Sequence, residues 1–216
     1  KKMVYKLIYF PFLGRGNQLR LLLSVSGAEW VDEKVSREYW LSIKDDQPFG
    51  QMPVLLDDSF RLAQGTAILS YVGQKEGLWP SSSPSDSFTC LSILFALEDL
   101  RGPLGKILFN KWSSSVSLAA FKTLCSSTIP SFIVYLNRIL GDGPFFFGDS
   151  LTAADLSAFD VFFQMKEFLP DAFTVFSKDA SLLSWFHRVS ADPRVSKFLL
   201  SIADDVSSFK DRPKPF

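Results

Sequence analysis

Histidine and cysteine are scarce in this sequence of 216 residues. His187 is the only histidine, so a Ser-His-Asp triad would have a single possible base. One histidine also provides few ligands for a zinc or iron site. Cys90 and Cys125 lie far apart and form neither a CxxC pair nor a disulfide framework, so we interpret both as core residues. We therefore expect no metal site and no disulfide-linked fold.

An excess of charge of one sign is also missing. The 23 Lys and Arg residues balance 23 Asp and Glu residues, so the chain has no positive field to attract nucleic acid or an anionic membrane. No uninterrupted apolar run approaches the roughly 20 residues that cross a bilayer, and the amino-terminal residues do not resemble a secretory signal. We expect a cytoplasmic protein with neither a nucleic-acid partner nor a membrane partner.

The pattern of apolar residues changes near residue 80. Before that point, short strand-type runs and helix-type runs follow the order β-α-β-α-β-β-α. Residues 57–59 suit a hairpin turn between the last two strands, whereas the earlier strands are joined through helices and should run parallel. The pattern predicts a mixed four-stranded sheet that is covered by helices.

A turn-rich segment with prolines and serines marks the predicted linker at residues 80–87. Downstream, apolar residues recur at helical spacing, which predicts an all-α bundle. Within that bundle, Thr152 and Asp155 have the spacing of a capping box at the start of a helix. The predicted architecture is α+β, with a sheet domain at 1–79, the linker at 80–87 and a helical domain at 88–216.

Three segments of the first domain are candidates for one ligand-binding cleft. Tyr9 ends the first strand, a position where side chains commonly meet ligands. Pro53 begins the third strand, where a backbone edge can pair with an extended peptide. Gln64 and Gly65 open the third helix, whose free N–H groups favour a carboxylate. Each of these residues also has a simpler interpretation as a packing or turn residue.

Four segments together resemble a cytosolic glutathione transferase of the tyrosine type, with the sigma class closest: KLIYFPFLGRG, YWLSIKDDQPFGQMPVL, LAQGTAILSYV and GDSLTAADL. The likeness covers nearly the whole chain in order and with matching spacing. It implies a thioredoxin-like first domain, a helical second domain and a homodimer. It also implies an enzyme that activates glutathione as a thiolate for attack on a small, largely apolar electrophile, with no metal and no cofactor beyond this co-substrate.

The resemblance assigns roles by position. Tyr9 matches the tyrosine whose hydroxyl donates a hydrogen bond to the glutathione sulfur, and Arg15 matches an arginine that assists the thiolate in related classes. Asp99 matches a carboxylate that reaches the ligand bound in the opposite subunit. The other residues at glutathione-binding positions are Trp40, Lys44, Gln51, Met52, Pro53, Gln64, Gly65 and Thr66. The second-substrate pocket is expected to be bordered by Phe12, Leu13, Arg101 and Leu104.

Gly65 departs from the family pattern, which usually has Ser or Thr there to bind the γ-glutamyl carboxylate. A hydrogen bond to a charged group contributes about 1.5 to 3 kcal/mol, so we expect weakened binding unless Thr66 replaces the hydroxyl. The alternative interpretation is a glutathione-fold binding or structural, crystallin-like protein with weak or no transferase activity. Sigma relatives include prostaglandin isomerases, detoxifying enzymes and lens proteins, and the sequence does not choose among them.

The fourth predicted helix carries helix-breaking residues beside the expected pocket. Gly102, Pro103 and Gly105 predict a kink or break there. Arg101 and Lys106 would add positive charge, which favours an anionic or polar electrophile, although both side chains are equally compatible with a solvated surface. The tail before Phe216 is a further candidate to close the pocket.

Overall fold

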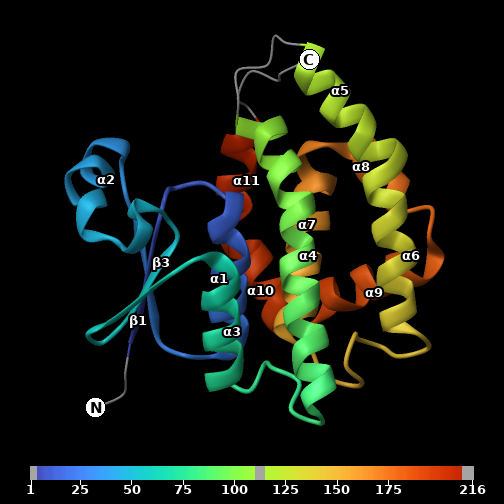
Figure 1. Ribbon diagram of the computed structural model, residues 1–216, viewed down its shortest axis with the longest axis horizontal. Coiled ribbons are helices and arrows are strands. Elements are labelled where there is room, and N and C mark those ends of the chain that lie inside the picture. Colours follow the sequence, from blue (N-terminus) through green and yellow to red (C-terminus); the bar gives the residue numbers. More distant parts are fainter. Residues whose placement is uncertain (1–3, 110–114, 211–216) are drawn as a thin grey trace.

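The computed structural model describes residues 4–109 and 115–210, and the tail before Phe216 lies outside them. Figure 1 shows a small sheet domain beside a larger group of helices, with α1 (Gly14–Ser26) and α3 (Gly65–Lys75) lying between the two. This arrangement confirms the predicted thioredoxin-like domain followed by an all-α domain.

The sheet has four strands in the order β2-β1-β3-β4. The strands are β1 (Tyr5–Tyr9), β2 (Trp30–Lys34), β3 (Val54–Asp57) and β4 (Phe60–Ala63). As predicted, β1 and β2 are parallel, and β3 and β4 form an antiparallel hairpin. Strand β3 also runs antiparallel to β1, with Leu7 opposite Leu55. The carboxyl end of β1 therefore lies beside the start of β3.

The two faces of the sheet are covered by different helices. Leu7 and Leu55 belong to the main apolar core with residues of α1 and α3. Ile8, next to Leu7, and Val54, next to Leu55, pack with Trp40 on the other face of the sheet. Trp40 belongs to α2 (Arg37–Ile43). Because strand side chains alternate between faces, the same two strands support both layers. The 3₁₀ turns η1 (Lys44–Asp46) and η2 (Pro48–Gly50) then lead from α2 to β3.

The helical domain is organised around α7 (Ala153–Phe168), in which every residue from 153 to 165 is buried. The surrounding helices are α4 (Pro84–Phe109), α5 (Ser115–Thr123), α6 (Ile129–Leu140), α8 (Pro170–Phe176), α9 (Ala180–Ala191), α10 (Pro193–Ser201) and α11 (Ala203–Lys210). A π-helical turn, η3 (Leu124–Thr128), joins α5 to α6. Cys90 is buried in this core, as expected, and burial raises the pKa of its thiol to about 12.

Helix α4 differs from the sequence prediction at two places, the predicted linker at residues 80–87 and the helix-breaking residues around Pro103. It begins at Pro84, inside the segment predicted as a linker, and it continues through Pro103 to Phe109. Of the predicted kink or break at Gly102 to Gly105, the break is therefore wrong. Proline removes a single intrahelical hydrogen bond, and the buried residues Leu100, Leu104 and Ile107 hold both sides of Pro103 against the core.

One helical run, Leu118–Leu140, is long and apolar enough to cross a membrane by length and composition, with a mean hydropathy of 1.2. It comprises most of α5, then η3 and α6, and it packs against α4, α8 and α9. One such run is a weak sign of a membrane span, and the absence of a membrane partner stays a prediction.

The start of α7 is built on the buried carboxylate of Asp155. Its two oxygens accept hydrogen bonds from the backbone N–H and hydroxyl of Thr152, the backbone N–H of Phe146 and the indole N–H of Trp185, at 2.7 to 3.0 Å. Asp155 thus does more than the predicted capping box requires, because it also ties the preceding loop and α9 to the start of α7.

We predict that Asp155→Ala lowers the free energy of unfolding by about 3 kcal/mol or more, because it removes a cap and leaves several buried donors unpaired. That loss corresponds to a melting temperature lowered by roughly 6 °C or more for a chain of this size. Denaturant titration measures it, with Asp149→Ala as control because Asp149 is exposed just before the same helix. Equal stability of the two variants would contradict the prediction.

Candidate active site

A cleft lies where the loop between β1 and α1 meets α4, the turns after α2, and the start of α3. It consists of two adjoining cavities of about 670 and 730 Å³ that share Arg15, Gln51 and Met52. The first cavity is also lined by Tyr9, Phe10, Phe12, Gly14, Trp40, Lys44, Gly50, Arg101, Gly102, Leu104, Gly105, Lys106, Leu108 and Gln164. The second is also lined by Pro53, Gln64, Gly65, Thr66, Ala67, Leu91, Phe95 and Glu98.

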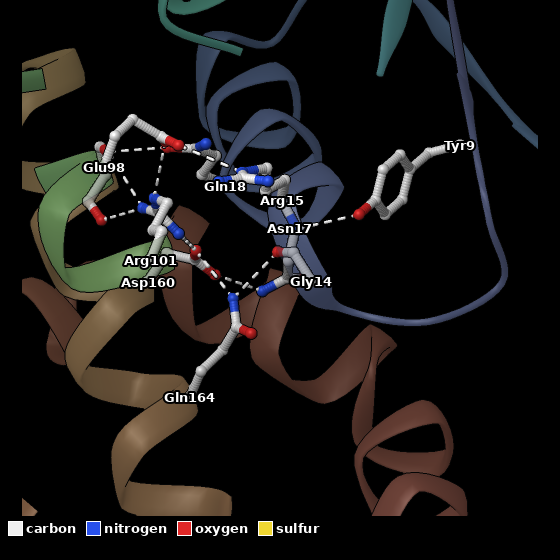
Figure 2. A network of polar contacts seen from close by, with 10 residues as sticks. Tyr9, Gly14, Arg15, Asn17, Gln18, Glu98, Arg101, Asp160 and Gln164 are labelled. Carbon is white, nitrogen blue, oxygen red and sulfur yellow. Dashed lines mark hydrogen bonds and ion pairs between the residues drawn. The ribbon is translucent and has the colours of Figure 1, made fainter. Parts of the chain in front are cut away.

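Tyr9 lies at the carboxyl end of β1, and its ring rests on the backbone at the start of α1. A Cβ on Gly16 would lie 2.3 Å from a ring carbon of Tyr9, and one on Gly14 would lie 2.8 Å from the hydroxyl. Only residues without a side chain allow this approach. The phenol oxygen then accepts a hydrogen bond from the backbone N–H of Arg15 at 3.1 Å (Figure 2).

The loop that carries Tyr9 is held by Arg20, a buried residue of α1. Its guanidinium donates to the carbonyl oxygens of Phe10 and Phe12 at 2.9 and 2.8 Å and pairs with Asp32 of β2 at 2.9 Å. The guanidinium carbon also lies 5.6 Å from the centre of the Tyr9 ring. Arg20 therefore fixes the path of the chain between the strand and the helix.

Burial raises the pKa of the Tyr9 phenol, although the backbone N–H of Arg15 and the charge of Arg20 oppose part of the rise. The phenol therefore stays protonated at neutral pH. Because its oxygen accepts from a backbone N–H, its own proton is available to a group in the cleft. The N-terminus of α1, next to this hydroxyl, additionally favours negative charge there.

The guanidinium of Arg15 turns toward α4, where its Nε pairs with a carboxylate oxygen of Glu98 at 3.1 Å. Its side chain is 54% exposed, so solvent and Glu98 both reduce the field it exerts in the cleft. Arg15 thus acts on the phenol in two ways. Its backbone N–H donates a hydrogen bond to the phenol oxygen, and its guanidinium adds a positive charge that Glu98 partly compensates.

Arg101 lines the first cavity as expected, but it is buried and its charge is paired. It donates to the carboxylate of Asp160 at 2.5 Å and to the backbone carbonyl of Ser157 at 2.6 Å. Burial raises the pKa of Asp160, and Arg101 and Asn17 oppose the rise by contacting its oxygens. The positive charge of Arg101 is therefore balanced at the floor of the cleft and does not support an anionic electrophile.

Gln164 of α7 links this buried pair to the site. Its amide nitrogen donates to Asp160 at 3.0 Å and to the carbonyl oxygen of Gly14 at 3.1 Å, across 150 positions of the chain. Figure 2 shows Gln164 reaching from the helical domain toward the start of α1. The turn that presents its N–H to Tyr9 is thus anchored to the second domain.

The walls of the first cavity combine polar and aromatic surfaces. Trp40 and Lys44 line it from the α2 side. Phe10 and Phe12 stack with ring centres 5.4 Å apart and both line it as well. Leu104 borders the cavity as expected, whereas Leu13 is 2% exposed in the core and does not line it. The expectation for Leu13 is wrong because the loop turns it inward to pack with α1.

The second cavity is formed around the start of α3. Gln64 has a φ of 73°, a left-handed conformation that is uncommon for a residue with a side chain. Its amide donates to the side-chain oxygen of Gln51 at 3.0 Å. Gly65 and Thr66 follow at the first turn of the helix, and Pro53 opposite them follows a cis peptide bond. Free backbone N–H groups at such a helix start favour an anion.

Asp99 lies outside the two cavities, exposed on α4. Sequence reasoning did not assign roles to Phe10, Arg20, Leu108 or Gln164. The position of Phe10 directly after Tyr9 could have indicated its role. No sequence pattern could have indicated Gln164, because only the packing of α7 on α1 brings it to the cleft.

Two family models match the chain, one on each domain. The N-terminal domain of glutathione S-transferase matches residues 5–74, and the C-terminal domain of glutathione S-transferase matches residues 98–201.

Individual proteins are similar over most of the chain. Glutathione S-transferase P 1 of Xenopus laevis is 28% identical over 207 residues, which cover 92% of this chain and 93% of that protein. Hematopoietic prostaglandin D synthase of Gallus gallus is 29% identical over 154 residues, 70% of this chain and 74% of that one. A solved glutathione S-transferase of Necator americanus, described as monomeric, has a TM-score of 0.78 at 26% identity and covers 91% of this chain and 96% of that one.

We predict that Gly16→Ala displaces the Tyr9 ring and lowers the free energy of unfolding by about 1 to 3 kcal/mol, because its methyl group has no room beside the ring. Gly105→Ala is the matched control, since an added Cβ there meets nothing within 4 Å. The control should stabilise the helix by up to about 1 kcal/mol. Denaturant titration measures the change in the free energy of unfolding for each variant. A change of the same sign in both variants would contradict the prediction.

Proposed function

The chain belongs to the glutathione S-transferase family, whose two domain models it matches, and on this premise we propose that Tyr9 activates glutathione for attack on an electrophilic carbon. The observation that carries the proposal is the hydrogen bond from the Arg15 backbone N–H to the Tyr9 oxygen, which leaves the phenol proton free to donate into the cleft. The sigma class and the tyrosine type are part of this proposal.

The tripeptide lies across both cavities. Its glycine carboxylate is held near Trp40 and Lys44, the lysine contributing charge. Its cysteinyl backbone pairs with that of Met52, before the cis bond to Pro53. Its γ-glutamyl carboxylate lies at the start of α3, at Gly65 and Thr66, with Gln64 beside it. Charge at both ends of the ligand is thereby matched by a cation at one end and a helix N-terminus at the other.

The sulfur is placed at the junction of the cavities, in reach of the Tyr9 hydroxyl. A free thiol has a pKa of about 8.5, and lowering it by about two units requires roughly 2.7 kcal/mol of preference for the anion. One charge-assisted hydrogen bond supplies about 1.5 to 3 kcal/mol. The donated bond from Tyr9 therefore accounts for most of the activation, and the Arg15 charge, compensated by Glu98, adds less.

The second substrate is a largely apolar electrophile that lies against the stacked rings of Phe10 and Phe12 and against Leu104. Gly102 and Gly105 on α4 face this cavity with no atom within 4 Å of an added Cβ, so the wall leaves room for a bulky, planar group. The thiolate forms a bond to the electrophilic carbon, and the bond to a leaving group breaks. No cofactor beyond glutathione takes part in this step.

We predict that Tyr9→Phe raises the pKa of bound glutathione by about one to two units, because the donor to the thiolate is lost. At neutral pH, kcat/KM for an aryl halide should fall by roughly 10- to 100-fold, and the rise of activity with pH should shift upward. The thiolate absorbance of the bound tripeptide and the pH–rate profile measure both effects.

Tyr135→Phe is the control, because Tyr135 is 47% exposed on α6 and lines neither cavity. An unchanged pH profile for Tyr9→Phe would contradict the thiolate mechanism. Retention of wild type on immobilised glutathione without any turnover would instead support a glutathione-binding protein without transferase activity.

The homodimer is proposed from three exposed aromatic side chains, of which Phe95 lines the second cavity. Phe88 and Phe95 of α4 are 71% and 60% exposed, and Phe49, at the turn before β3, is 78% exposed with a φ of 59°. Aromatic side chains are enriched at protein interfaces, and we propose that the α4 surface carrying Phe88 and Phe95 is such an interface. A second subunit on this surface would bring Asp99 of each chain toward the glutamyl end of the partner's cleft.

We predict that the protein sediments as a species of two chains and that Phe88→Glu converts it to one chain, because a carboxylate in an apolar interface is not solvated. Leu200→Glu is the control, since Leu200 is 77% exposed on α10, away from this surface. One solved relative is described as monomeric. If wild type sediments as a single chain at micromolar concentration, the dimer and the role of Asp99 are both wrong.

A further inference from the structure

The amide of Gln18 has a hydrogen-bond donor that no described residue uses. Gln18 lies on α1 and is 1% exposed. Its side-chain oxygen accepts a hydrogen bond from the Ser157 hydroxyl at 2.7 Å, whereas its nitrogen is buried without a partner in the described part of the chain. A buried, unpaired donor is unfavourable, so this nitrogen is a candidate to meet a ligand.

A chain of hydrogen bonds determines which way the amide points. The guanidinium of Arg101 donates to the Ser157 hydroxyl oxygen at 3.1 Å, so the proton of that hydroxyl is directed to the oxygen of Gln18. The oxygen of the amide must therefore face Ser157, and its nitrogen must face the opposite way. Figure 2 shows Gln18 and Arg101 at the two ends of this part of the network.

The nitrogen of Gln18 faces Gly65 at the N-terminus of α3. A Cβ on Gly65 would lie 3.2 Å from it, and no other surrounding side chain or neighbouring segment comes within 4 Å of that position. Gly65 also lines the second cavity. The absent side chain thus leaves a notch beside the amide. The nitrogen itself is closed to solvent and Gln18 does not line the cavity, so a ligand has to open this contact to reach it. The backbone of Gly65 has no positive φ that would require glycine, so what distinguishes the residue is the space it leaves.

We propose that Gln18 binds the γ-glutamyl carboxylate of glutathione, donating from its amide nitrogen through the notch at Gly65. This inference rests on the proposed function. The donor comes from α1 instead of from a hydroxyl on residue 65, and it acts beside the free N–H groups of α3, which favour the same anion. Gly65 then does not by itself imply weak binding, because the lost hydroxyl has a replacement.

Calorimetric titration with two ligands tests the proposal. One ligand is glutathione, and the other is 4-aminobutyryl-cysteinylglycine, which lacks only the α-carboxylate of the glutamyl residue. Gln18→Met removes the donor at similar volume. Gly65→Ala places a methyl group in the notch, 3.2 Å from the amide nitrogen, so the amide must shift slightly while it keeps its donor. Each variant should raise the dissociation constant of glutathione by about 10- to 100-fold and leave that of the analogue unchanged.

Gly65→Ser in the Gln18→Met background should recover affinity for glutathione, because the new hydroxyl supplies a donor at the same place. Wild-type affinity in both Gln18→Met and Gly65→Ala overturns the inference and leaves the proposed function intact. An equal rise in the dissociation constants of both ligands also overturns it. Such a result would mean that the substitutions damage the fold and do not remove a contact with the α-carboxylate. If wild type does not bind glutathione, the proposed function is wrong as well.

Discussion

The contact between the Tyr9 ring and the backbone of Gly14 to Gly16 is the constraint on which the cleft depends. The ring lies so close to this backbone that a methyl group on Gly16 would overlap it. The same closeness brings the Arg15 N–H within 3.1 Å of the phenol oxygen. A hydroxyl that accepts from a backbone group has its proton left for a ligand, and burial keeps that proton in place at neutral pH.

This contact is held from both domains. Within the first, Arg20 fixes the carbonyls of the loop after β1. From the second, Gln164 holds the carbonyl of Gly14, and Asp160 receives Asn17 of α1 together with Arg101 of α4. A buried carboxylate with three donors is favourable only while all of them are present. The site is therefore a property of the packed pair of domains, and neither domain contains all of it.

Several features followed from local sequence alone. Alternating apolar residues and hairpin residues predicted the strands, and Thr152 with Asp155 predicted the start of α7, because periodicity and capping act between near neighbours. Three features did not follow from the local sequence: the burial of Leu13, the compensated charge of Arg101, which lines the cavity as predicted, and the continuity of the helix past Pro103. Each is decided by packing: Leu13 lies in the main core, Asp160 neutralises Arg101, and the core holds α4 together past Pro103.

The sequence by itself determined the two-domain architecture and the residue types available at the strand ends, since these depend on patterns within short stretches of chain. Only the tertiary structure decided which of those residues share a cavity, which charges are compensated and where an unused donor remains. Gln18 shows the difference. Its place on α1 follows from helical spacing, but its unpaired nitrogen exists only because Ser157 takes the other end of the amide and Gly65 leaves space beside it. Hydrogen bonding and electrostatic pairing act through space, so residues 139 positions apart settled what the local pattern left open.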